Sequence, residues 1–336
     1  MAAERPNTLL TARDFQSTQI NDWCAGCGDH GILRGLEKAL ALLGCSPDEV
    51  AVFGGIGCSG KTPYYLNSYG VHTLHGRLVP YAMGAKLANP DLTVIAVGGD
   101  GDGLSIGAGH FVNAGRRNLD MTYILFNNGV YGLTKGQASP TLRQGEQIKT
   151  MPRPNIQANV NPVLLALTSG YTWVGRGYAY DVKSLAKLIA EAIRHPGIAC
   201  LDVLQPCPVY NNLHTMEWYN DRIYSLQSEG QDPVISNPAD EEGNREKRTQ
   251  AMARAQEWGD RIPVGIFLQD LTQPQFLDQI ADRQPQYLNN PPAIQAVSDD
   301  TGKPLREMRQ LFGELDQVYS KSHYLQIENL ELNTTI

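Results

Sequence analysis

Short apolar runs alternate with longer segments of helical spacing through the first two thirds of the chain. The apolar runs predict strands at residues 50–53, 71–74, 93–97, 121–126, 171–175 and 198–204. Apolar residues recurring at intervals of three and four predict helices over residues 30–43, 80–88, 103–116, 162–169 and 181–194. Such alternation implies a doubly wound α/β fold, in which helices cover both faces of a mostly parallel sheet.

The pattern changes after about residue 225. Residues 226–260 are polar and charged, with a helix predicted from about 246 to 258. Residues 261–267 form an isolated apolar run, and residues 268–336 are rich in Gln, Asn and Pro. We therefore expect an α/β domain over residues 1–225 and an irregular C-terminal extension over residues 226–336.

Composition narrows the classes of function. The 336 residues carry a formal net charge of −7, which disfavours binding to nucleic acid or to an anionic membrane. No apolar run approaches the roughly 18 residues of a membrane-spanning helix, and the first residues lack a secretory apolar segment. We expect a cytoplasmic protein whose six cysteines are reduced thiols or metal ligands.

Polar motifs follow two neighbouring predicted strands. Gly99-Asp100-Gly101 follows the strand at 93–97, and Asn127-Asn128 follows the strand at 121–126. Open α/β sheets bind ligands at the carboxyl ends of their strands, and Mg²⁺ prefers carboxylate and amide oxygens. Gly101 and Gly103 also open a predicted helix whose amides favour an anion. The two motifs together are typical of a clamp for a metal ion and a diphosphate.

The cysteines fall into two classes. Cys45 follows a predicted helix end and Cys200 lies inside an apolar strand, so both are expected to be structural. The others lie in predicted loops, two of which leave strands at the same edge as the Gly-Asp-Gly turn. These loop cysteines are Cys24, Cys27, Cys58 and Cys207. Four convergent thiolates suit either a 4Fe–4S cluster or a zinc site.

Five motifs occur in the order typical of one enzyme family. They are Trp23-Cys-Ala-Gly-Cys-Gly-Asp29, Gly55-Ile-Gly-Cys-Ser-Gly-Lys61, His75-Gly-Arg77, Gly99-Asp-Gly-Asp-Gly103 and Asn127-Asn-Gly-Val-Tyr-Gly-Leu-Thr-Lys-Gly136. With them the chain closely resembles the β subunit of 2-oxoacid:ferredoxin oxidoreductases over about residues 14–225, plus residues 261–267. The resemblance implies a thiamine-diphosphate fold with one 4Fe–4S cluster.

The resemblance also implies residue roles. Magnesium would be held by Asp100, Asn128 and the Val130 carbonyl, and the cluster by Cys24, Cys27, Cys58 and Cys207. The residues expected around thiamine diphosphate are Ile56, Gly57, Cys58, Ser59, His75, Gly99, Asp100, Gly101, Asp102, Gly103, Asn128, Val130, Tyr131 and Gly132. Those expected near the 2-oxoacid or coenzyme A are Lys61, Leu133 and Lys135. These roles have alternatives: Asp102 could cap a helix, His75 could be structural, and Lys61 and Lys135 could be solvated surface residues.

In this family the cofactor carries out oxidative decarboxylation of a 2-oxoacid, and coenzyme A takes the acyl group. Electrons pass through the cluster to ferredoxin, and the reaction can run in reverse. The chain shows no motif for the glutamate that activates thiamine, which in the family belongs to the α subunit. The resemblance therefore implies a dimer of αβ heterodimers in which this chain alone is inactive. Residues 226–336 would wrap that partner or cover the cluster.

The substrate is expected to be 2-oxoglutarate, because Tyr131-Gly-Leu-Thr-Lys-Gly-Gln137 is similar to the 2-oxoglutarate branch of the family. The alternatives are a pyruvate:ferredoxin oxidoreductase and a thiamine-diphosphate decarboxylase or synthase without redox chemistry. A non-catalytic module with a four-cysteine zinc site is an alternative from a different class.

Overall fold

The computed structural model describes residues 10–301, 303 and 305. The chain divides into two units, Met1–Asn289 and Asn290–Ile336. Within the described residues, the larger unit contains every strand and the candidate site. No helix in these residues is both long enough and apolar enough to span a bilayer.

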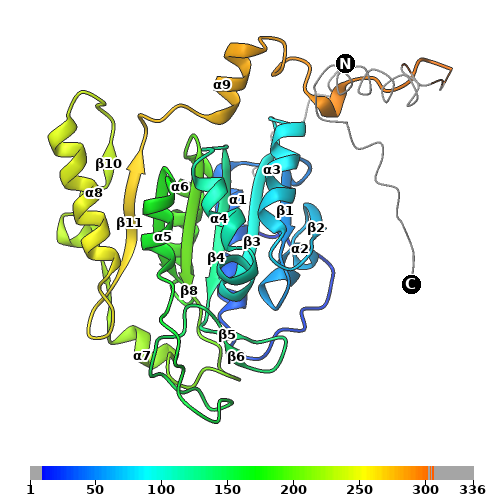
Figure 1. Ribbon diagram of the computed structural model, residues 1–336. Helices are drawn as coiled ribbons and strands as arrows, with labels where there is room; N and C mark the ends of the chain where they lie inside the picture. Colours follow the sequence, from blue (N-terminus) through cyan, green and yellow to red (C-terminus); the bar gives the residue numbers. More distant parts are fainter. Residues whose placement is uncertain (1–9, 302, 304, 306–336) are drawn as a thin grey trace, which may run out of the picture. The chain divides into compact units, whose positions relative to one another are not determined.

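A mostly parallel sheet forms the centre of the larger unit, and its described strands follow the order β10-β11-β7-β8-β4-β3-β1-β2 (Figure 1). All neighbours in this order pair in parallel except β11 and β7. The strands are β1 Val50–Gly54, β2 Tyr69–His72, β3 Thr93–Gly99, β4 Met121–Asn127, β7 Trp173–Tyr178, β8 Ile198–Leu204, β10 Val234–Ile235 and β11 Ile262–Asp270. Strand β9 (Ile223–Ser225) pairs with β11 outside this order, and β5 (Val130–Tyr131) pairs with β6 (Gln137–Ala138) as a separate hairpin.

Helices bury their apolar sides against both faces of the sheet. On one face lie α1 (Asp29–Leu43) and α6 (Val182–Arg194), which contribute Leu36 and Ile189 to one apolar core. The second core contains residues of the helices α3 Leu78–Ala88, α4 Ala108–Gly115, α5 Pro162–Ser169 and α8 Glu241–Ala255. Shorter helices are α2 Thr62–Tyr65, α7 Met216–Asn220 and α9 Phe276–Arg283. This arrangement confirms the predicted doubly wound α/β fold.

The segment after β3 differs from its prediction. One helix was expected over residues 103–116, but Asp102–Ile106 form a π-helical turn and α4 begins only at Ala108. The Gly107 amide donates to the Asp102 carbonyl at 3.1 Å, which closes the wider turn. Side chains of the turn are thereby placed differently from those of a continuous α-helix, and π-helical turns are frequent at functional sites.

The apolar run at 261–267 is part of the main sheet, not an isolated segment. It forms most of β11, which pairs antiparallel with β7 and parallel with β9 and β10. Helix α8 packs beside β11 (Figure 1). The compact unit therefore continues to Asn289, beyond the boundary expected at residue 225.

The described part of the second unit is short. It contains a 3₁₀ turn at Pro292–Ile294 and a loop in which the Thr301 amide donates to the Asp299 carboxylate at 2.9 Å. The predicted wrapping or covering segment was residues 226–336; residues up to Asn289 belong to the larger unit, and residues 306–336 lie outside the described residues.

Candidate functional site

The candidate site lies where the central parallel strands end. Gly55 follows β1, Asp100 follows β3, Asn128 follows β4 and Gln205 follows β8. These strands are neighbours in the sheet and run in parallel, so their carboxyl ends lie along one edge. The four following loops are thereby brought together from positions up to 150 residues apart.

A cavity of about 280 Å³ opens between these loops and the β5–β6 hairpin. It is lined by Ile56, Gly57, Cys58, Ser59, His75, Gly99, Asp100, Gly101, Asp102, Asn128, Val130, Tyr131, Gly132, Leu133 and Thr134. With the exception of Gly103, these include every residue expected around thiamine diphosphate. Of the residues expected near substrate, Leu133 lines the cavity, whereas Lys61 and Lys135 do not.

Asp100 is a buried carboxylate held by several donors. Its Oδ2 accepts hydrogen bonds from the Gly129 amide at 2.9 Å, the Ser139 hydroxyl at 2.5 Å and the Thr141 hydroxyl. Its Oδ1 accepts from the Gly101 amide at 2.9 Å. Burial raises the pKa of Asp100, although these hydrogen bonds lower it. A nearby cation would reverse this rise and favour the charged carboxylate.

Asn128 lies beside Asp100 in the cavity wall with its amide group oriented by two contacts. Its Nδ2 donates to Gln205 Oε1 at 2.6 Å, and its Oδ1 accepts from the Val130 amide at 3.0 Å. The chain can turn directly after Asn128 because the next residue, Gly129, has a φ of 74°, a conformation that glycine adopts without strain.

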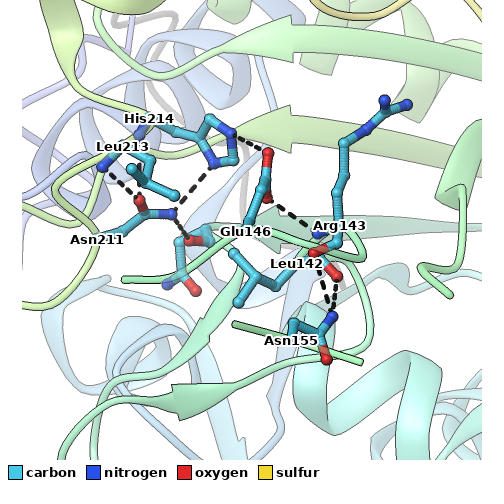
Figure 2. A network of polar contacts seen from close by, with 8 residues as sticks. Leu142, Arg143, Glu146, Asn155, Asn211, Leu213 and His214 are labelled. Atoms are coloured by element: carbon cyan, nitrogen blue, oxygen red, sulfur yellow. Dashed lines mark hydrogen bonds and ion pairs between the residues drawn. The ribbon is translucent and has the colours of Figure 1, made fainter. Parts of the chain in front are cut away.

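A polar network of Asn211, His214 and Glu146 (Figure 2) holds the backbone carbonyl of Asn128. Asn211 Nδ2 donates to the Asn128 carbonyl at 2.8 Å and to His214 Nδ1 at 3.3 Å. Since His214 Nδ1 accepts, Nε2 carries the hydrogen and donates to Glu146 at 3.1 Å. Burial raises the pKa of Glu146, but hydrogen bonds from His214 and the Arg143 amide outweigh it and leave the pKa lowered. The network thus ends at the charged carboxylate of Glu146.

Asp102 joins three loops of the cavity wall instead of capping a helix. Its Oδ1 accepts from His75 Nδ1 at 2.7 Å, the Gly76 amide at 2.8 Å and the Ile56 amide at 3.2 Å. Because a carboxylate can only accept, Nδ1 of His75 carries a hydrogen. Donation from His75 Nε2 to a phosphate oxygen would then require the imidazolium form.

The loops that carry the four predicted cluster cysteines are tied together by hydrogen bonds. Trp23 Nε1 donates to the Cys58 carbonyl at 2.8 Å, and the Gly28 amide donates to the Pro206 carbonyl at 3.1 Å. These contacts join the Cys24–Cys27 loop to the loops of Cys58 and Cys207. Cys200 is buried in β8, as expected for a structural cysteine, and Cys45 is partly buried after α1.

The four cysteines that were predicted to hold a cluster are thiols without disulfide partners. Burial raises the pKa of Cys27, and Asp29 and Cys207 raise it further. Burial, Asp29 and Cys207 likewise raise the pKa of Cys58 to about 11, and burial raises that of Cys207. Bound metal would be needed to keep them as thiolates. Among the described residues, no three His, Cys, Asp or Glu side chains form a group suited to a metal ion.

The two lysines expected near substrate differ from each other. Lys61 is not a lone cation, because its Nζ lies 2.8 Å from Asp22 Oδ2. Lys135 is exposed on the β5–β6 hairpin with a φ of 85°, which is unusual for a residue other than glycine. The structure therefore pairs Lys61 within the chain and presents Lys135 to solvent.

Sequence reasoning missed several residues of the site. Gln205 could have been found, because it directly follows the predicted strand at 198–204. Ser139 and Thr141 carry no such signal, since the turn that brings them to Asp100 depends on the β5–β6 hairpin.

Comparison with known proteins identifies the family. The C-terminal TPP binding domain of thiamine pyrophosphate enzymes matches residues 44–203, and the C-terminal part of the pyruvate ferredoxin oxidoreductase beta subunit matches residues 207–284. The 2-oxoacid:ferredoxin oxidoreductase subunit beta of Saccharolobus solfataricus is 51% identical over 297 residues, covering 88% of this chain and 96% of that protein. The chain belongs to the β-subunit family of 2-oxoacid:ferredoxin oxidoreductases. It is thus a subunit of a thiamine-diphosphate-dependent oxidoreductase, as the motifs predicted.

Other relatives of this β subunit have more specific names. The 2-oxoglutarate oxidoreductase subunit KorB of Mycobacterium tuberculosis is 45% identical over 200 residues, covering 60% of this chain and 54% of that protein. The solved 2-oxoglutarate:ferredoxin oxidoreductase from Magnetococcus marinus, with 2-oxoglutarate, coenzyme A and succinyl-CoA bound, aligns with a TM-score of 0.75 at 35% identity. That alignment covers 91% of this chain and 96% of the other. Family membership sets aside the non-catalytic zinc module as an account of the chain.

Proposed function

We propose that this chain is the β subunit of a 2-oxoglutarate:ferredoxin oxidoreductase that forms succinyl-CoA and CO₂ and passes electrons through a 4Fe–4S cluster to ferredoxin. The observation that carries the proposal is the cavity where Asp100, Asn128 and Cys58 meet, because it joins a metal–diphosphate clamp to a cysteine loop. Thiamine diphosphate would supply the carbanion chemistry of decarboxylation when bound.

The residues around Asp100 fit a magnesium ion and a diphosphate. Asp100 is a fully buried carboxylate, and Asn128 offers an amide oxygen whose second lone pair can bind a cation. Gly101 leaves space for the ring of Tyr131 in the wall, since a Cβ there would lie 2.2 Å from that ring. Asp100, Asn128 and the Val130 carbonyl would hold the ion, and His75 and Ser59 would orient the diphosphate.

The cysteine loops fit a cluster better than a single zinc ion. The thiols of buried Cys27 and partly buried Cys58 each lie close enough to buried Cys207 for it to raise their pKa, and exposed Cys24 also acts on Cys58. Electron transfer to ferredoxin needs a redox-active centre, which a 4Fe–4S cluster supplies and zinc does not. These cysteines would hold the cluster, and the Cys58 loop would bring it next to the cofactor cavity.

An apolar surface around the cavity supports an α-subunit partner. Leu133 in the cavity wall is 48% exposed, and Ile106, which packs against Gly76 next to His75, is 61% exposed. The edge strand β2 is exposed along its length. Exposed apolar groups around a polar cavity are typical of a protein interface. We infer that the α subunit covers this surface and contributes the remaining catalytic residues, in a dimer of heterodimers.

The preference for 2-oxoglutarate is supported by the relatives named KorB and by the solved structure that contains 2-oxoglutarate and coenzyme A. Leu133 lines the cavity and Lys135 is exposed two residues further along the same hairpin, and we expect both to contact substrate or coenzyme A. Lys61 could do so only by leaving Asp22. Either direction of the reaction is compatible with this assignment, including reductive carboxylation.

The test is to co-purify the chain with its α subunit under anaerobic conditions and to follow CoA-dependent reduction of ferredoxin. We expect kcat/KM for 2-oxoglutarate to exceed that for pyruvate by at least about tenfold, a difference of about 1.4 kcal/mol. The chain alone should be inactive. A preference for pyruvate would place the enzyme in the pyruvate branch. CO₂ release without ferredoxin reduction would indicate a non-redox thiamine enzyme, and zinc without iron would exclude the cluster.

A further inference from the structure

Gln205 occupies a position between the two proposed cofactor sites. It directly follows β8, is 1% exposed, and its backbone amide donates to the Asn127 carbonyl at 2.8 Å. Its side chain fits because Gly28 has none: a Cβ on Gly28 would lie 2.8 Å from Gln205 Cγ. Gly28, directly after the Cys24–Cys27 loop, thus leaves room for a side chain that follows β8.

Every polar atom of the Gln205 amide group is used. Its Nε2 donates to Cys27 Sγ at 3.3 Å and to the Pro206 carbonyl at 3.0 Å. Its Oε1 accepts from Asn128 Nδ2 at 2.6 Å. A flipped amide would place oxygen against the Pro206 carbonyl and nitrogen against the Asn128 nitrogen, so one orientation is strongly favoured.

This orientation determines which atom Asn128 presents to the cavity. The oxygen and nitrogen of an Asn amide have nearly the same shape, and hydrogen bonds decide which faces a ligand. Because Gln205 accepts from Nδ2, Oδ1 of Asn128 is directed away from Gln205 and toward the Val130 amide. Without Gln205, only the Val130 amide would hold the Asn128 side chain, and the flipped orientation that presents a donor to the cation would cost less.

The same side chain also acts on Cys27. Hydrogen bonds to the sulfur ligands of an iron–sulfur cluster withdraw charge and favour the reduced state, which raises the reduction potential. We propose that Gln205 is a positioning residue shared by both sites, which orients Asn128 toward Mg²⁺ and stabilises the Cys27 thiolate. The inference rests on the proposed function, because it needs both cofactors.

The test compares Gln205→Met with Gln231→Met in the co-purified αβ complex. Methionine is similar in length to glutamine but has no amide group, so it can neither donate to Cys27 Sγ nor accept strongly from Asn128 Nδ2. Gln231 is a matched control, because it is also buried and donates to the Phe267 carbonyl at 3.2 Å beside β11. Measurements are iron and sulfide content, the midpoint potential of the cluster by EPR-monitored titration, and Mg²⁺ affinity in the presence of thiamine diphosphate.

In Gln205→Met we expect unchanged iron and sulfide, a more negative midpoint potential and Mg²⁺ binding weakened at least about tenfold. Gln205→Glu keeps an acceptor for Asn128 but loses the amide donors, so Mg²⁺ affinity should recover while the potential stays low. This second variant separates the two roles and covers the case in which Gln205→Met fails to assemble. Gln231→Met should match the wild type in all three measurements.

The outcomes separate this inference from the function on which it rests. If the wild-type complex lacks iron or does not bind thiamine diphosphate, both are overturned. If the wild-type complex holds both cofactors but either the potential or the Mg²⁺ affinity of Gln205→Met equals that of Gln231→Met, the shared role of Gln205 is wrong and the proposed function stands.

Discussion

The backbone of Gly101 lies directly against the ring of Tyr131 in the cavity wall. A Cβ at this position would lie 2.2 Å from Tyr131 Cε1 and 2.7 Å from Cδ1 and Cζ. Carbon atoms pack best at about 3.5–4.0 Å, so Gly101→Ala requires the Tyr131 ring to move by more than about 1 Å. The ring is held in place by the β5–β6 pairing and by a hydrogen bond from its hydroxyl to the Gly101 carbonyl at 3.3 Å.

We expect this overpacking to cost about 1–3 kcal/mol and to lower the Tm of the cofactor-free αβ complex. Because Tyr131 lines the cavity, the displaced ring should also weaken thiamine-diphosphate binding at least about tenfold, measured by calorimetry. The double variant Gly101→Ala/Tyr131→Ala removes the clash. It should be less destabilised than the sum of the two single variants by about 1–3 kcal/mol.

Gly109→Ala is the matched control. Its added methyl group would meet no atom within 4 Å, and Gly109 is exposed in α4, where alanine is favoured by about 0.5–1 kcal/mol. Its Tm should equal or exceed that of the wild type. The steric argument would be refuted if Gly101→Ala melted and bound cofactor like the wild type, or if the double variant equalled the sum of the singles.

Three further predictions concern the metal sites and pH. Alanine at any of the loop cysteines (Cys24, Cys27, Cys58 and Cys207) should abolish the absorbance of the cluster at about 400 nm. The control variants Cys45→Ala and Cys200→Ala should retain this absorbance. Full retention in Cys207→Ala would contradict the ligand assignment. Asp100→Ala should lose calorimetric binding of thiamine diphosphate with Mg²⁺ while keeping its iron, and unchanged affinity would exclude Asp100 as a ligand. Burial lowers the pKa of His195 from 6.5 to about 4, so the unfolded chain binds the extra proton first as pH falls. The free energy of unfolding of the wild type, measured by denaturant titration, should therefore drop by up to about 3 kcal/mol as the pH falls from 6.5 to 4. In His195→Gln this drop should be smaller, and an equal drop in both proteins would contradict the assignment to His195.

The features that could be predicted from sequence are those fixed by strand order and strand ends. Asp100, Asn128 and Cys58 each lie within a few residues of an apolar strand, and parallel strands bring their carboxyl ends to one edge whatever the loops do. The cavity lining therefore agrees closely with the expected cofactor residues. The fold class was also predictable, because the alternation of strands and helices can be recognised from local sequence patterns.

The features that could not be predicted depend on contacts between distant segments. Strand β11 pairs with β7, whose partner residues lie 89 to 96 positions earlier in the chain, and no local pattern specifies that pairing. The glycine-rich sequence around Lys61 suggested a free cation. In the fold Lys61 is instead paired with Asp22, 39 residues away in the sequence. The sequence places Gln205 at the end of a predicted strand. Its proposed role depends on the orientation of its side chain, which the spacing of residues in the sequence does not determine.

The two sides of the cavity differ in how firmly the chain holds them. On the inner side, Asp100 and Asp102 are each 1–2% exposed and fixed by several hydrogen bonds within this subunit. On the outer side, Leu133 and Lys135 are exposed on a short hairpin with a strained backbone. Catalytic geometry requires rigid support from surrounding residues, so the inner side is prepared for the cofactor before assembly. We therefore expect cofactor binding to depend mainly on this chain, and substrate selection to depend on the α subunit that we propose covers the outer side.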